Sequence, residues 1–167
     1  MMVPAWALTL SYWLHMMATV LWLGGLAAVV LLIHPTARRL PPADQSALLE
    51  AAQRRLDPVG WFCLALLTGT GLIQMSASPQ YEGFLAVTNT WAGAILIKHV
   101  VFFGMAGVSA YLTWFSLPEL QRAALKQASG KPVDLVPLQN RNLLLLRLNL
   151  LLGIIVLVLT ALARASA

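Results

Sequence analysis

The chain has 167 residues, of which 59% are hydrophobic and only 10% are charged, and its formal net charge is +5. An ordinary soluble domain is roughly 45–50% apolar and about 25% charged. So few polar groups cannot cover so much apolar surface in water, and the composition therefore excludes an ordinary soluble fold. It predicts an all-α integral membrane protein.

Four apolar segments are long enough to cross the hydrocarbon core, which takes about 20 residues as a helix. They cover residues 6–33, 59–77, 90–115 and 143–163. We expect the first to end at His34, because proline disfavours helical geometry in the residue before it. The intervening segments 34–58 and 116–142 are expected to be loops, the first with a short amphipathic helix over residues 44–56. The whole chain is thus expected to be one four-helix membrane bundle.

Most basic residues lie in the loops 34–58 and 116–142, whereas the connection between the second and third spans has no Lys or Arg. By the positive-inside rule these two loops are cytoplasmic and both termini face outward. The expected location is the bacterial cytoplasmic (inner) membrane, with lipid as the first partner. Because the charge reports orientation, no nucleic-acid partner is expected. The sequence leaves open a redox partner protein, a larger membrane complex and a homo-oligomer.

Three ionisable side chains lie deep within the spans: His15, Lys98 and His99. Such groups are costly in hydrocarbon and are therefore candidates for a functional site. Each histidine lies about nine residues into its span, which places both roughly 14 Å below the outer helix ends. The first and third spans run in the same direction, and two imidazoles at one depth suit the two axial ligands of a haem iron. The spacing predicts a haem b site with His15 and His99 as ligands.

Each of these residues has an alternative role. A histidine in a membrane helix also commonly forms a hydrogen bond to a neighbouring helix. Lys98 could extend to the interface, neutralise a haem propionate or, if burial deprotonates it, bind the iron. Thioethers such as those of Met16 and Met17 suit Cu(I), but neighbouring residues cannot both face one site, and packing is the simpler role for them.

Small and aromatic residues surround the histidines in the sequence. Trp22 lies on the same helix face as His15. Thr68 begins a Thr-Gly-Thr-Gly run that would form a thin wall from the second span, and Gly25 would allow a close helix approach or leave room for a flat ligand. The predicted cofactor-binding set is completed by four residues, namely Trp22, Gly25, Thr68 and Lys98.

The first span carries the pattern His15-x6-Trp22-x2-Gly25-Leu26. This pattern resembles the first helix of CopD-type copper-resistance membrane proteins and of the related HemJ-type protoporphyrinogen oxidases. Three further stretches are similar to the other helices of that superfamily, namely RRLDPVGWFCLALLTGTGLI, WAGAILIKHVVFF and RLNLLLGIIVLVLTALARA. The resemblance implies a four-helix bundle that binds haem b, with His15 as a ligand and Lys98 at the family's lysine position.

Two departures separate the chain from the HemJ-type proteins, which have an arginine where this chain has Val30 and a glutamate where it has Leu150. The departures count against protoporphyrinogen oxidation, although Arg147 and Asn149 fit that pattern. The leading hypothesis is a haem b protein that transfers electrons near the periplasmic face, alone or within a redox complex. The alternatives are an enzyme that oxidises protoporphyrinogen, and copper transport or tolerance without haem.

Overall fold

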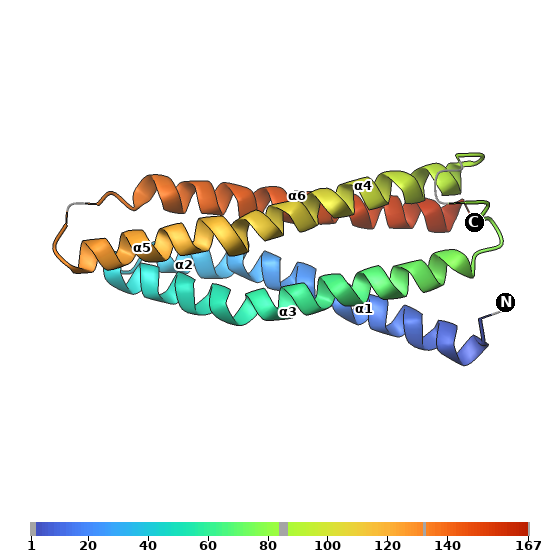
Figure 1. Ribbon diagram of the computed structural model, residues 1–167, viewed down its shortest axis with the longest axis horizontal. Helices are drawn as coiled ribbons and strands as arrows, with labels where there is room; N and C mark the ends of the chain where they lie inside the picture. The colour runs from blue at the N-terminus through green and yellow to red at the C-terminus, as the bar shows by residue number, and fades with distance from the viewer. Residues whose placement is uncertain (1–2, 84–86, 132, 167) are drawn as a thin grey trace.

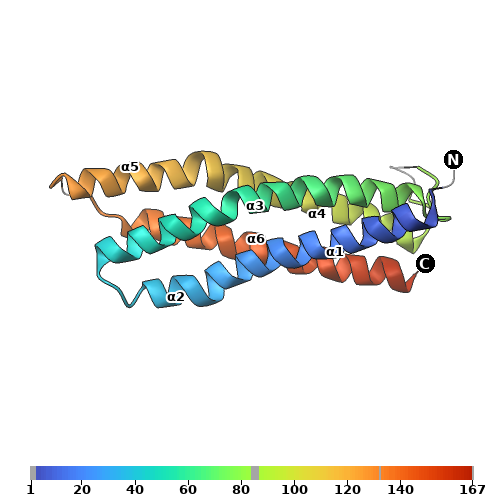
Figure 2. The same ribbon diagram turned by 90° about the horizontal axis from the view of Figure 1, so that it is seen from below.

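The computed structural model describes residues 3–83, 87–131 and 133–166, and all regular structure within them is helical. Four long helical rods lie side by side, and both termini lie at one end of the bundle (Figures 1 and 2). All four rods are long and apolar enough to cross a membrane. The predicted four-helix membrane bundle is therefore confirmed. The half of the bundle that holds the termini is called the terminal half here, and the other the loop half.

The first and third rods each contain a π-helical turn. The first consists of α1 (Ala5–Ala28), the turn η1 (Val29–Ile33) and α2 (His34–Ala37). The second rod is α3 (Pro42–Ser76). The third consists of α4 (Thr90–Tyr111), the turn η2 (Leu112–Ser116) and α5 (Leu117–Ala128), and the fourth is α6 (Val136–Ala165).

Each π turn lies just before a proline, Pro35 or Pro118. A proline inside an α-helix removes a hydrogen bond, and its ring clashes with the carbonyl four residues earlier. The wider π turn contains that carbonyl, and the first amide after each turn bonds to the carbonyl of the turn's first residue. The helix therefore continues through the proline instead of ending before it.

The predicted loops at 34–58 and 116–142 are corrected by the structure, because both are largely helical. The first and third rods continue past their prolines through the π turns. The amphipathic helix predicted over 44–56 joins the second span within α3, which includes Pro58. A membrane helix tolerates proline when neighbouring groups and local adjustments satisfy the freed backbone. For that reason proline did not mark the helix ends as expected.

The rods form two antiparallel hairpins, α1 with α3 and α4 with α6, and the hairpins meet mainly through α1 and α6. The two hairpins approach each other closely at Gly153 of α6. A Cβ atom at this position would overlap Leu23 of α1 and lie 3.2 Å from Met105 of α4. Glycine is thus the residue that lets the two hairpins approach, as small residues commonly do between membrane helices.

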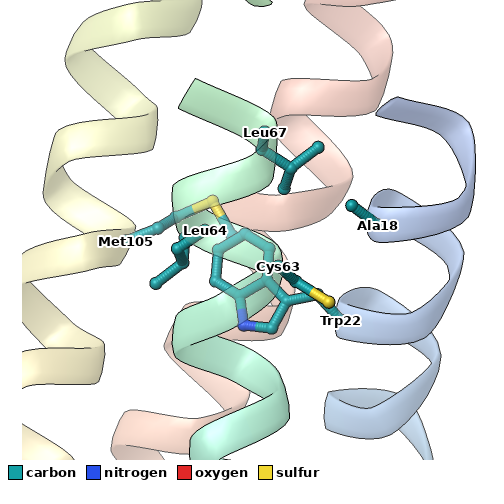
Figure 3. Close-up of a cluster of buried hydrophobic side chains, with 6 residues drawn as sticks. All are labelled: Ala18, Trp22, Cys63, Leu64, Leu67 and Met105. Carbon is teal, nitrogen blue, oxygen red and sulfur yellow. The ribbon is translucent and has the colours of Figure 1, made fainter. Parts of the chain in front are cut away.

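An apolar core cluster occupies the middle of the bundle and comprises Ala18, Trp22, Cys63, Leu64, Leu67 and Met105. Figure 3 shows how these side chains from α1, α3 and α4 meet around the Trp22 indole. Gly60 of α3 lies against that ring, since a Cβ there would be in van der Waals contact with it at 3.6 Å. The core cluster separates polar side chains of the terminal half from a partly polar pocket of the loop half.

We predict that Gly153→Leu lowers the free energy of unfolding by about 1–3 kcal/mol, the usual cost of overpacking. Gly104→Leu is the matched control, because nothing lies within 4 Å of a Cβ built at Gly104. Both changes raise helix propensity equally, so that only packing differs. Thermal unfolding in detergent measures the effect, and equal midpoints for the two variants would contradict the packing at Gly153.

Candidate functional site

His15 belongs to a polar cluster that joins α1 to α3. Its Nδ1 lies 2.8 Å from Oγ1 of Thr70. The Ser11 hydroxyl donates to the Thr70 carbonyl at 3.2 Å, and the Gln74 amide donates to the Ser11 carbonyl at 3.1 Å. Gly71 lies against the imidazole, because a Cβ there would be 3.6 Å from Cε1 of His15. The polar cluster therefore positions the imidazole ring between two helices.

The hydroxyl of Thr70 determines which nitrogen of His15 carries the proton. That hydroxyl has one hydrogen, which it donates to the Leu66 carbonyl at 2.6 Å. With the hydroxyl hydrogen donated in this way, Oγ1 accepts the hydrogen bond from His15 and Nδ1 carries the ring proton. Nε2 of the neutral ring then holds a lone pair and forms no hydrogen bond in the part of the chain that the structure describes. A metal-bound imidazole needs this protonation state, with its other nitrogen held by a polar group.

The His99 ring has the same protonation state for a different reason. Its Nδ1 lies 2.7 Å from the backbone carbonyl of Ile95, one turn earlier in α4. A carbonyl oxygen can only accept a hydrogen bond, so the proton must be on Nδ1. If the ring is neutral, its lone pair is on Nε2.

The π turns establish the relative depth of α1 and α4. Their first residues, Val29 and Leu112, are packed in one buried cluster. The residues fourteen positions before them are His15 and Lys98. Counted along straight helices from that shared cluster, these two lie at about the same level, and His99 lies about 1.5 Å nearer the loop half.

Two cations lie near His15 in the terminal half. Lys98 lies close enough to His15 for its charge to act on the imidazole. Arg164 of α6 lies close enough to Lys98 for the two side chains to interact electrostatically. The Arg164 guanidinium also lies 4.7 Å above the Tyr12 ring. Neither cation forms a salt bridge with any residue that the structure describes. The sequence analysis missed Arg164, because a basic residue in the last turn of a membrane helix is typical of a headgroup anchor.

The other predicted site residues lie apart from His15. Trp22 is at the centre of the core cluster, and both Trp22 and Gly25 line the loop-half pocket. Thr68 is exposed, and its hydroxyl donates to a carbonyl of its own helix. Positions two residues apart on a helix differ by about 200°, so α3 turns Thr70 rather than Thr68 toward His15.

The described residues contain no group of three or more His, Cys, Asp or Glu side chains that could hold a metal ion. The four methionines that the structure describes do not form a soft-metal site either. Met16 and Met17 are exposed, whereas Met75 and Met105 belong to separate buried clusters.

Comparison with known proteins identifies the family. Residues 50–163, more than half of the chain, match the model of the family described as copper resistance protein D, or CopD. The chain belongs to this family. It is thus a multi-pass membrane protein related to copper resistance, and the predicted CopD-type resemblance is confirmed. The matched region includes Lys98 and His99 but not His15, which precedes it.

The other two comparisons add no relative. No curated protein and no solved structure matches the chain.

We predict that His15 in the metal-free protein is protonated on Nδ1. Nitrogen-15 NMR of histidine-labelled protein measures this directly. Thr70→Val should abolish the preference, because valine cannot accept the hydrogen bond, whereas Thr68→Val should leave it unchanged. A His15 ring protonated on Nε2 in the unaltered protein would contradict the arrangement.

Proposed function

We propose that this copper-resistance family member binds haem b in the terminal half of the bundle, with Nε2 of His15 as an axial ligand of the iron. The observation that carries the proposal is the hydrogen bond of 2.8 Å between His15 and Thr70. This bond orients the ring, keeps the proton on Nδ1 and leaves the Nε2 lone pair for a metal. A neutral imidazole in this state is a standard ligand of haem iron.

His99 is the proposed second ligand. The Ile95 carbonyl gives its ring the same protonation state. The residue lies on α4, which runs parallel to α1, within about 1.5 Å of the depth of His15. Ligands from facing helices are a usual way for a helix bundle to hold a cofactor.

The charges near His15 suit a ligand with carboxylates. Lys98 and Arg164 are two cations without a salt bridge among the described residues. A cation within a membrane bundle is costly unless an anion accompanies it, and haem b carries two propionates. We therefore infer that Lys98 and Arg164 pair with the propionates and that these face the end of the bundle at which the chain termini lie.

A bound haem would supply one-electron transfer between ferric and ferrous iron. The protein would orient His15 through Thr70. The apolar core cluster would keep water in the loop half from reaching the haem site. If the basic loops are cytoplasmic, as the positive-inside rule predicts, the haem lies near the periplasmic face of the inner membrane. Electrons would then be exchanged with a partner protein or within a larger complex.

Copper handling is the second candidate, and membership of the CopD family favours it. Imidazole and thioether groups both suit copper. The lone pair on Nε2 of His15 would serve a copper ion as well as a haem iron. The two candidates therefore share a residue and differ in the bound group.

The test is the haem content of purified variants, measured by pyridine haemochrome assay and visible spectroscopy. We expect His15→Ala to lose bound haem, because alanine has no ligating atom. Thr70→Val should bind haem about 10–100-fold more weakly, the usual effect of removing the group that holds a ligating histidine. His99→Ala should retain a five-coordinate, high-spin haem.

His34→Ala is the matched control for these variants. His34 is also buried in the first rod, but it lies roughly 28 Å further along the helix, in the loop half. This variant should keep its haem. Full haem retention in His15→Ala would exclude the proposed ligand, and an unchanged low-spin spectrum in His99→Ala would exclude His99 as the second one.

A further inference from the structure

The loop half contains a pocket between the two hairpins that the proposed haem site does not use. It lies between α1, α3, α6 and the junction of α4 with η2, and its cavity volume is about 80 Å³. Most of its lining side chains are apolar, and four are polar: Gln53, Asp57, Ser109 and Asn149. Apolar walls with a few polar groups are the usual lining of a small-molecule site.

Asn149 gives the pocket an unsatisfied acceptor. Its side chain is only 1% exposed, and its Nδ2 donates to the Ser109 hydroxyl at 2.8 Å. Its Oδ1 has no hydrogen-bond partner among the residues that the structure describes. A buried acceptor without a donor is costly, and the cost is higher within a membrane bundle. The position of this amide oxygen is therefore best explained by a ligand that brings a donor.

Asp57 supplies a second acceptor. One carboxylate oxygen accepts a hydrogen bond from the Thr113 hydroxyl at 2.9 Å, and the same hydroxyl accepts one from the Trp61 indole at 3.2 Å. This chain of bonds holds the carboxylate in a defined orientation. Asp57 forms no salt bridge with a described residue, and none of the pocket's lining residues is Lys, Arg or His. The second carboxylate oxygen thus remains for a donor from a ligand.

We propose that this pocket binds a quinol, a membrane-soluble aromatic ring with two hydroxyl groups. The hydroxyls would donate to the Asp57 carboxylate and to Oδ1 of Asn149, and the ring would lie among apolar and indole side chains such as Trp22 and Trp61. The site goes beyond the proposed function, and binding does not depend on a bound haem.

Two observations favour a quinol over an inorganic cation. The pocket is also lined by Leu21 and Val59, which are 52% and 42% exposed, so that it reaches the side of the bundle that faces lipid. A hard cation that gives up its water needs about six oxygen ligands, whereas this pocket has four polar side chains among many apolar ones.

The first experiment measures the affinity of the purified protein for decylubiquinol, kept reduced without oxygen, and for the dimethyl ether of the same molecule. The ether keeps the ring and the tail but has no O–H donor. We expect saturable quinol binding and about tenfold weaker binding of the ether, because two buried acceptors would lose their donors. Equal affinities for the two molecules would overturn the proposal. Saturable sodium binding without quinol binding would also overturn it and would assign the pocket to a cation.

Variants identify the pocket as the binding site. Asn149→Leu and Asp57→Asn should each weaken quinol binding about tenfold, through the loss of an acceptor or of a charge-assisted bond. Asn142→Leu is the control for the first, since Asn142 is a buried asparagine of the same helix, accepts a hydrogen bond from Ser116 and lies outside this pocket. Asp44→Asn, at an exposed carboxylate, is the control for the second. Equal losses in the pocket variants and their controls would overturn the assignment.

The quinol site is tested separately from the haem site by repeating the titration on His15→Ala. This variant lacks the proposed iron ligand but keeps every residue of the pocket. We expect it to bind decylubiquinol with unchanged affinity. Loss of quinol binding in His15→Ala would overturn a separate site in the loop half, whatever the haem content of the unaltered protein.

Discussion

Buried polar contacts decide how the helices of this bundle pair, because apolar contact in lipid gives little preference for one partner over another. In the first hairpin, α1 and α3 are joined by the polar cluster around His15 and Thr70. In the second, two Asn–Ser contacts one heptad apart join α6 to α4 and η2. The contact between His15 and Thr70 therefore has two effects: it pairs two helices, and it leaves Nε2 of the imidazole in the state that a metal needs.

The bundle has three levels along its length. Polar groups and two cations lie in the terminal half, the apolar core cluster lies in the middle, and the loop half contains the pocket with Asp57 and Asn149. In the proposed account, an electron-carrying group and a membrane-soluble quinol would occupy opposite sides of the core cluster. The Trp22 indole lies where the middle level meets the loop half, because it belongs to the core cluster and also lines the pocket.

The fold could be predicted from the sequence, because transfer of whole segments into lipid depends on their summed hydropathy. The helix ends could not, since a π turn before a proline is not visible in composition. The sequence could not choose between Thr68 and Thr70 either, because packing determines how α3 is rotated about its axis. Asp57 and Asn149 were not recognised as one site, since four segments distant in the sequence form the pocket. His15 could be found, because a lone ionisable group at membrane depth is conspicuous in any sequence.

The central claim is that a member of a copper-resistance family holds a haem. The most direct measurement is the haem and copper content of the unaltered protein in one sample, after expression with both haem and copper supplied. We expect a b-type reduced-minus-oxidised spectrum, close to one haem per chain, and copper well below that ratio. Copper bound in proportion to the chain without haem would overturn the haem assignment and would make copper the group that His15 holds.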